Sequence, residues 1–201
     1  TCQRTSDFTG NSATATVNAL PAISEVAPTG ETCTQDNGKL TVTFSGGAGP
    51  YVISWSGTDP GSVADITSPY QITGLSAGTY DVTINDGNGC TSTSNGTALP
   101  YLPVTNVTDE PDTYYGTIQA AFDAAGSDEE IHICDGTYSE PVNTVPSPDK
   151  NIKVSPGSSP GCVEVTGMTL GTGDVLLMEL FGTTECTQYD QFTVNGTVTL
   201  N

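Results

Sequence analysis

Basic side chains are almost absent from this chain. Its 201 residues include four Lys or Arg against 23 Asp or Glu, so the formal net charge is −19. A protein so acidic repels phosphates, which excludes nucleic acid as a partner and argues against anionic membrane surfaces. Cations, Ca²⁺ above all, suit such a chain as ligands. The other interpretation is an acidic surface that keeps the protein dissolved in saline water.

Long helical patterns and long apolar runs are missing too. No run is long enough for a transmembrane helix, and no apolar leader opens the sequence, so we expect no membrane insertion. Gly, Pro, Ser, Thr and Asn separate short apolar runs along the whole chain. This texture predicts an all-β fold with many turns.

Histidine and closely spaced cysteine pairs are also scarce. The chain has one histidine, His132, and no CxxC pair, which makes a zinc site improbable on spacing alone. Six cysteines lie at positions 2, 33, 90, 134, 162 and 186. An even number in a Thr- and Asn-rich β protein predicts disulfides and an extracellular, secreted or surface-attached location.

Residues 25–104 show the alternation of a β-sandwich. In "KLTVTF", Leu40, Val42 and Phe44 face one way, and "YVISW" and "TYDVTI" alternate in the same manner. Short alternating runs between Gly/Pro turns predict antiparallel strands. Trp55 is in register with Tyr51 and Ile53, so we expect it in the core rather than on a sugar-binding surface.

Two cysteines flank these runs. Cys33 precedes the first run and Cys90 follows the last one. The ends of a small sandwich often lie close together, so we predict a Cys33–Cys90 disulfide. It would close a loop of about 58 residues and contribute roughly 4 kcal/mol in the chain-entropy treatment.

Residues 33–93 resemble a known repeat. The segment "CTQDNGKLTVTFSGGAGPYVISWSG…YQITGLSAGTYDVTINDGNGCTST" is similar to the SprB-type repeat of giant surface adhesins of gliding Bacteroidetes. The resemblance implies an Ig-like antiparallel β-sandwich, secretion to the cell surface and a tandem-repeat context. It implies no catalytic site.

The turn "NDGNG" at 85–89 has two interpretations. Asp86 and Asn88 are candidate Ca²⁺ ligands, because calcium sites use Asp and Asn oxygens. Asp-Gly and Asn-Gly also supply the positive φ angles of an ordinary hairpin turn, which is the interpretation we favour. Calcium is therefore the one cofactor that the sequence leaves open, and none is required.

Residues 1–24 have no strand partner before them in the sequence. "ATATV" is strand-like, and the segment resembles residues 90–104 in composition. We predict an orphan strand, which either ends a preceding module or pairs with a neighbouring subunit. If the strand pairs with a neighbouring subunit, Cys2 can form an intermolecular disulfide.

Residues 105–201 begin with a helix pattern. Ile118, Ala121, Phe122 and Ala125 form one apolar stripe, and Gly126 sits where the helix should stop. Short apolar runs at irregular spacing follow, which predicts a small solenoid of about three coils. The opening "TIQAAFDAAGSDEEIHICDGTYSE" resembles the start of right-handed parallel β-helix proteins of the pectin-lyase-like class over residues 115–142. That resemblance implies a capping helix on a short right-handed parallel β-helix.

The cluster "GSDEEIHICDGTYSE" is the strongest candidate for catalysis. His132 alternates with Ile131 and Ile133, so it should face away from the core, and no second histidine accompanies it. Asp128, Glu129 and Glu130 read as a polar turn. Acid–base catalysis needs paired groups that the sequence does not bring together, so we expect no enzymatic activity and no catalytic residue.

Three cysteines remain for the last module. We predict one pair, Cys162 with Cys186 or Cys134 with Cys162. Cys134 is also a candidate for an intermolecular link with Cys2.

The sequence thus predicts a secreted structural or adhesive protein. It is a module of a surface adhesin or a filament subunit that assembles head to tail through open β edges, with copies of itself or adjoining repeats as partners. The alternative is a carbohydrate-binding module, with Tyr114, Tyr115 and Tyr189 as sugar-stacking candidates, or a non-catalytic fragment of a polysaccharide-degrading enzyme. Polysaccharide is then the partner.

Overall fold

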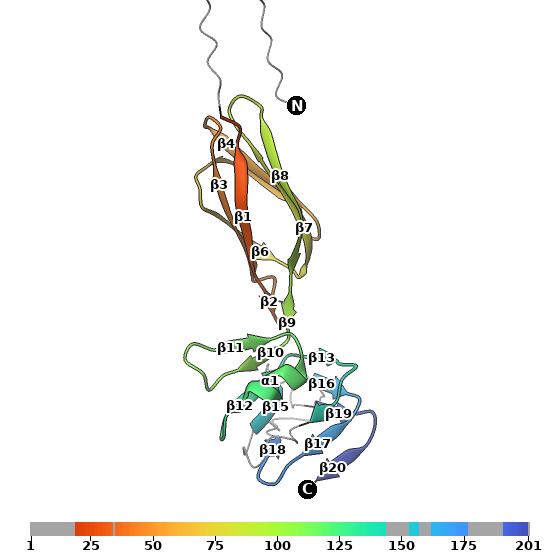
Figure 1. The fold of residues 1–201 in the computed structure, drawn as a ribbon. Coiled ribbons are helices and arrows are strands. Elements are labelled where there is room, and N and C mark those ends of the chain that lie inside the picture. The colour runs from red at the N-terminus through yellow and green to blue at the C-terminus, as the bar shows by residue number, and fades with distance from the viewer. Residues whose placement is uncertain (1–18, 34, 144–152, 157–161, 177–190, 201) are drawn as a thin grey trace, which may run out of the picture. The chain divides into compact units, whose positions relative to one another are not determined.

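The chain divides into two units, residues 1–100 and residues 101–201, each with its own buried apolar cluster. The computed structural model describes residues 19–33, 35–143, 153–156, 162–176 and 191–200 (Figure 1). In this part of the chain strands predominate and there is a single helix, which confirms the all-β prediction.

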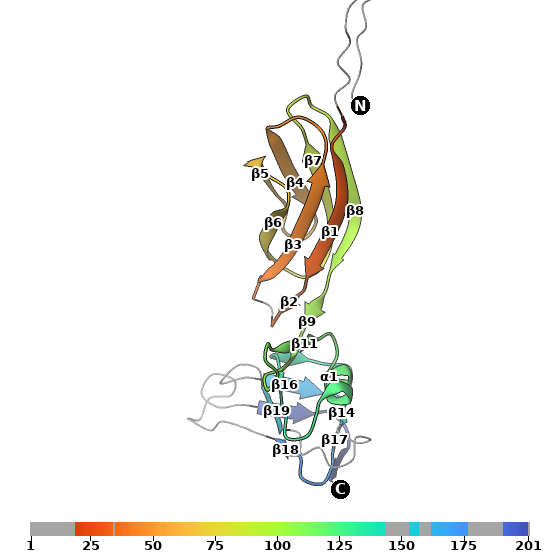
Figure 2. The same cartoon turned by 60° about the vertical axis from the view of Figure 1, so that its left-hand side comes forward.

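The first unit contains two antiparallel sheets. One has the order β1-β3-β6 and the other the order β5-β4-β7-β8 (Figures 1 and 2). Their strands are β1 (Ala22–Thr29), β3 (Gly38–Ser45), β4 (Tyr51–Ser56), β5 (Gly61–Ile66), β6 (Tyr70–Leu75), β7 (Gly78–Asn85) and β8 (Thr91–Leu99). The two-residue strand β2 (Glu31–Thr32) lies between β1 and β3 in the chain.

The inward faces of these strands are the ones that alternation predicts. The side chains of β3 and β7 at the alternating apolar positions are 0–5% exposed, and they share one cluster: Leu40, Val42, Phe44, Tyr80, Val82 and Ile84. Because both sheets contribute to this cluster, burial of their inner faces is what joins them.

Trp55 belongs to this packing rather than to an open platform. Its ring is partly buried against the cluster, and its Nε1 donates to the carbonyl of Asp59 at 2.7 Å. The ring lies over Gly61, its cross-strand partner, where an added Cβ would come within 2.3 Å of the indole. The expectation of a core role for Trp55 is therefore confirmed.

The first strand of the unit was not predicted. β1 pairs with β3 from Ala22↔Ser45 to Thr29↔Lys39, so the unit begins before the predicted boundary at residue 25. β1 reads "AISEVAPT". Glu25 and Pro28 interrupt the alternation of apolar and polar residues, so the sequence pattern did not predict this strand. The predicted orphan strand "ATATV" lies outside the described residues.

The second unit contains three sheets built from strands that recur in threes. The orders are β11-β10-β12-β15-β18, β13-β16-β19 and β14-β17-β20, and every pair from β12 onwards is parallel. Each successive pass of the chain therefore adds one strand to each sheet.

The strands of the second unit are short. They are β9 (Tyr101–Leu102), β10 (Val104–Asn106), β11 (Thr113–Tyr115), β12 (Glu130–Ile133), β13 (Gly136–Thr137), β14 (Val142–Asn143), β15 (Lys153–Pro156), β16 (Cys162–Val165), β17 (Met168–Leu170), β18 (Val175–Leu176), β19 (Gln191–Val194) and β20 (Val198–Leu200).

Helix α1 (Ile118–Ala124) covers the first pass of these strands. Thr117 is its N-cap, and the cap side chain accepts from the backbone N–H of Ala120 at 3.2 Å. Ile118, Ala121 and Phe122 are at most 1% exposed and belong to the cluster of the second unit. The predicted apolar stripe and helix end are confirmed.

α1 is also too short and too polar to cross a membrane, and the described residues contain no other helix.

Candidate functional site

A shallow groove lies on the sheet β13-β16-β19, whose strands β16 and β19 run side by side in Figure 2. Two rows of outward side chains cross it. In one row Thr137, Glu164 and Thr193 are in register, and in the other Cys162 is in register with Gln191. The groove is lined by Asp135, Gly136, Thr137, Cys162, Val163, Glu164, Gln191 and Thr193.

Hydrogen bonds fix the polar groups of this groove. The hydroxyl of Thr137 donates to Glu164 Oε2 at 3.0 Å, and the side-chain amide of Asn195 donates to Glu164 Oε1. The backbone N–H of Cys162 donates to Asp135 Oδ1 at 3.0 Å. The lining thus offers carboxylate, amide and hydroxyl groups, which can form hydrogen bonds with the hydroxyl groups of a ligand.

The sequence pointed to one wall of this groove, since Asp135, Gly136 and Thr137 belong to the cluster "GSDEEIHICDGTYSE", but not to the strands that complete it. Its strands β13 and β16 come from different passes of the chain, separated by more than 20 residues. Parallel register between passes decides which side chains are neighbours, and coil lengths are too irregular for the sequence to give that register.

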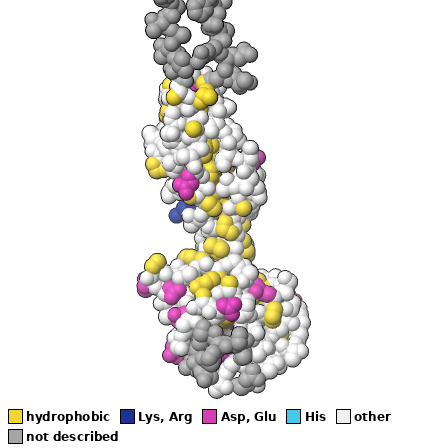
Figure 3. Space-filling view, in the orientation of Figure 1, with side chains coloured by type: hydrophobic (Ala, Val, Ile, Leu, Met, Phe, Trp, Pro, Cys, Tyr) yellow, Lys and Arg dark blue, Asp and Glu magenta, His cyan; other side chains and the backbone are white. Residues whose placement is uncertain are grey.

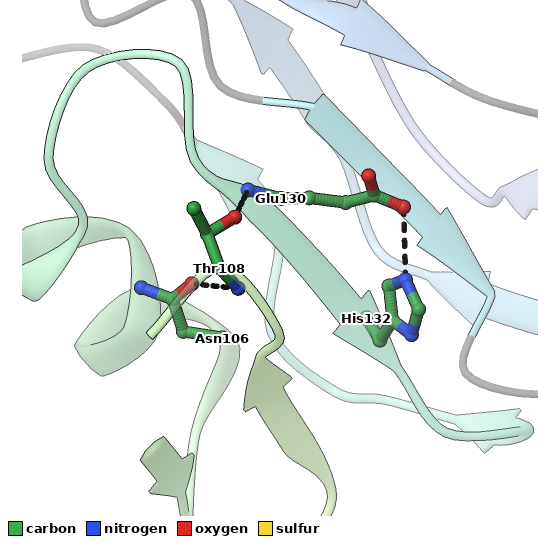
Figure 4. A network of polar contacts seen from close by, with 4 residues as sticks. All are labelled: Asn106, Thr108, Glu130 and His132. Carbon is green, nitrogen blue, oxygen red and sulfur yellow. Dashed lines mark hydrogen bonds and ion pairs between the residues drawn. The ribbon is translucent and has the colours of Figure 1, made fainter. Parts of the chain in front are cut away.

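His132 lies at the outer face of β12, as predicted, while Ile131 and Ile133 are buried. Its Nε2 is 2.9 Å from Glu130 Oε1, and both side chains are about one-third exposed (Figure 4). In the same view, Thr108 accepts from the backbone N–H of Glu130 at 2.8 Å, and Asn106 accepts from the N–H of Thr108 at 3.1 Å. These contacts fasten the loop after β10 to β12, a structural task.

The predicted calcium ligands lie in a closed hairpin turn. Asp86 is 5% exposed, and its carboxylate accepts from the backbone N–H groups of Ala48, Asn88 and Cys90 at 3.1, 3.0 and 2.8 Å. Three N–H dipoles with their positive ends on the carboxylate disfavour a cation at the same oxygens. Among the described residues no group of three His, Cys, Asp or Glu is arranged for a metal. The turn interpretation accounts for the contacts of Asp86 and Asn88, and calcium binding at these two residues stays a prediction.

Acids hold turns together elsewhere in the first unit. Glu31 is 4% exposed, and its two oxygens accept from the N–H groups of Asp36 at 3.1 Å and Ala77 at 2.6 Å. Asp59 accepts from the N–H of Ser76 at 2.7 Å and lies 2.9 Å from the hydroxyl of Tyr80. Some of the acidic side chains of this chain thus accept hydrogen bonds from backbone N–H groups that have no partner within the sheets.

These contacts lower the pKa of two Asp carboxyls, Asp59 and Asp86, and raise the pKa of the Tyr80 hydroxyl. The N–H of Ser76, then its hydroxyl, then Tyr80 lower the pKa of Asp59. Burial opposes ionisation of Asp86, but the N–H groups of Cys90, Ala48 and Asn88 outweigh it and lower its pKa. Burial first, then the hydrogen bond and charge of Asp59, raise the pKa of Tyr80 to about 12.

We expect the first unit to lose stability in acid. A carboxylate with a lowered folded-state pKa contributes stability above its unfolded pKa, about 3.9 for Asp, and loses it as the pH falls through the folded value. The urea midpoint of the first unit should therefore fall between about pH 5 and pH 2. For Asp86→Asn the midpoint should be lower at pH 7 and depend less on pH over that range.

Asp65→Asn is the matched control. Asp65 is exposed on β5, where a positive φ of 58° suits Asn as well as Asp, and its carboxylate accepts no hydrogen bond within the described ranges. Equal pH dependence in the wild type and in Asp86→Asn would contradict the role given to Asp86.

Two of the three sugar-stacking candidates lie on opposite faces of one strand. Tyr114 and Tyr115 are neighbours on β11, so their side chains point to opposite faces. Tyr114 is 45% exposed, whereas Tyr115 packs against the cluster of the second unit, and burial there raises its pKa. Tyr189 lies outside the described residues.

The predicted Cys33–Cys90 pair is wrong. Cys33 and Cys90 are both disulfide-bonded, but they sit at opposite ends of the first unit. The N–H of Glu31 donates to the carbonyl of Pro100, whereas Cys90 precedes β8, the nine-residue strand that leads to Pro100. Nine extended residues span about 30 Å, and a disulfide needs Cα atoms within about 7 Å.

The physical reason is strand direction. β3 and β7 run the same way in the two sheets, since Ala48 after β3 contacts Asp86 after β7. The start of β3 and the end of β7 are therefore far apart. Cys134 and Cys162 are disulfide-bonded as well, and no described cysteine is free. Cys2 and Cys186, the other members of the predicted sets, lie outside the described residues.

Comparison with known proteins gives one match. Residues 26–60, from β1 to the end of the loop before β5, match the family model described as SprB repeat. This supports the first of the two resemblances over part of its range, and no finding supports the second. No curated protein and no solved structure gives a match. The repeat is typical of surface-attached or secreted proteins of Bacteroidetes, which indicates an adhesin-type module at an extracellular location.

Proposed function

We propose that this chain is a non-catalytic structural module of a surface adhesin. The observation that carries the proposal is the SprB-repeat match at residues 26–60, within the first unit. Composition agrees, because an acidic, cysteine-containing, Thr-rich β protein suits an oxidising extracellular environment.

The architecture of both units fits this role. We interpret the first unit as an Ig-like β-sandwich, since two antiparallel sheets share one buried cluster. We interpret the second as a short right-handed parallel β-helix, since three parallel ladders each gain one strand per pass.

The absence of catalysis is part of the proposal. His132 is engaged with Glu130, and the groove between β13 and β19 is lined by carboxylates, hydroxyls and an amide but no histidine, lysine or cluster of basic groups. Figure 3 shows acidic side chains mainly over the second unit and hardly any basic ones on the visible face, which agrees with the composition.

Surface labelling tests the location. Antibodies raised against the purified chain should label intact cells of the organism that produces it, and mild protease treatment of intact cells should remove the signal. Labelling that appears only after permeabilisation would overturn the proposal.

Polysaccharide binding is a second candidate, and the groove favours it. The binding of the purified chain and of a Glu164→Gln variant to a glycan array can be compared. Binding that the variant loses would support this candidate, and no binding to any glycan would remove it. Calcium finds no support at Asp86.

The head-to-tail filament stays a prediction. Its donor strand lies in residues 1–18, outside the described part of the chain.

A further inference from the structure

The first and last strands of the first unit, β1 and β8, lie side by side and run in the same direction. Where both strands begin, the N–H of Ile23 donates to the hydroxyl oxygen of Ser92 at 3.1 Å. Just after both strands end, the N–H of Glu31 donates to the carbonyl of Pro100 at 2.9 Å. Figure 2 shows the two arrowheads at the same end. The chain therefore enters the unit at one end, the entry end, and leaves it at the opposite end, the exit end.

Each of these two strands is paired along its whole length with an inner strand of its own sheet. β1 pairs antiparallel with β3 along residues 22–29, and β8 pairs antiparallel with β7 along residues 91–99. β3 and β7 in turn carry the buried side chains that join the two sheets. The strands through which the chain enters and leaves are thus both fastened to the centre of the unit.

Asp86 ties these strands together at the entry end. Pro21, the residue before β1, and Asp86, in the turn after β7, both lie against Gly47, where an added Cβ would come within 3.2 Å of each. The carboxylate of Asp86 also accepts from the N–H of Ala48, which follows β3, at 3.1 Å. The start of β1 and the ends of β3 and β7 are therefore held at one place.

This topology decides how the first unit responds to tension along the chain. A pull on the residues before β1 and after β8 draws these two strands in opposite directions, each along its own axis. The hydrogen bonds of an antiparallel ladder lie perpendicular to the strands, so this pull loads all bonds of a ladder together, in shear. A pull across the strands from one end would instead break the bonds one pair after another. The hairpin of β4 and β5 lies outside the path of the load.

We propose that the first unit resists tension through a mechanical clamp, defined as the β1–β3 and β7–β8 ladders together with the two hydrogen bonds that join β1 and Glu31 to β8 and Pro100. The inference rests on the proposed function, because a module of a surface adhesin carries the force between the cell and the object that the adhesin holds. The clamp lets the unit transmit this force lengthwise without unfolding.

Single-molecule unfolding of the whole chain at constant force tests the direction of the load. Attachment handles at the exposed positions Ala19 and Pro100 pull the unit lengthwise, whereas handles at Ala19 and the exposed Asn88 both act at the entry end and peel β1 from its first pair. Lifetimes under force report the rate of unfolding rather than equilibrium stability. We expect the lengthwise lifetime to be more than about tenfold longer at the same force, because several hydrogen bonds must break together. Equal lifetimes in the two directions would overturn the inference.

Two serine variants provide a matched pair. Ser92→Ala removes the bond from Ile23 to β8, within the clamp, and Ser62→Ala removes a bond of 3.0 Å from the Ser62 hydroxyl to the carbonyl of Ile53, between β5 and β4. Under lengthwise load, Ser92→Ala should shorten the lifetime roughly fivefold, the rate effect of one hydrogen bond of average strength. Ser62→Ala should keep the lifetime of the wild type. Equal changes in the two variants would contradict the clamp.

The urea midpoint of the first unit in each variant shows that it still folds, so a shorter lifetime is not a folding defect. Force measurements use the purified chain, and their outcome does not depend on where the protein is located. Surface labelling that fails would remove the adhesin role and leave the clamp measurable. Surface labelling that succeeds, together with equal lifetimes in the two pulling directions, would overturn the clamp alone.

Discussion

Replacing Phe122 by alanine is expected to lower the free energy of unfolding of the second unit by about 3–5 kcal/mol. Phe122 is 1% exposed on the inner face of α1 and packs in the cluster that joins the helix to the first strands of the second unit. Truncation removes apolar contact area and leaves a cavity where the helix covers these strands. Hydrogen exchange followed by mass spectrometry in increasing urea measures the two units separately.

The first unit should be unaffected, because its buried cluster is a separate set of residues. Ala124→Ser, at an exposed position on the same helix, is the control and should change little. If Phe122→Ala lowers the free energy of unfolding of the second unit by less than about 1 kcal/mol, the packing of α1 contributes little to stability. Such a small loss is typical of core substitutions that proteins tolerate.

Reduction of the disulfides should have the second large effect. All four described cysteines are disulfide-bonded, and removing a native disulfide from a small secreted domain costs about 2–5 kcal/mol. We expect a clearly lower melting temperature in the presence of a reductant, at constant pH and salt. Cys90→Ser alone should reproduce part of the decrease in the first unit.

Peptide mapping without reduction is the matching control. Cys33 and Cys90 should appear in separate cross-linked peptides, because about 25–30 Å of extended chain separates them. A peptide that joins Cys33 to Cys90 would contradict the arrangement of β3, β7 and β8 described above.

Several features of the fold were within reach of the sequence. Alternation in residues 39–44 and 80–84 predicted the buried faces of β3 and β7, and the spacing of Ile118, Ala121 and Phe122 predicted α1. β1 was missed because charge and proline interrupt its pattern. The groove was missed because its walls come from separate passes of the chain.

The sequence by itself determined the class of the protein, the inward side of most strands and the single helix, because each of these depends on side chains a few positions apart. Tertiary structure decided where Cys33 and Cys90 lie, which backbone groups the Asp86 carboxylate accepts from, and which strands line the groove. Those outcomes depend on strand direction and on register between distant segments, and a local pattern of apolar and polar residues fits several such pairings equally well.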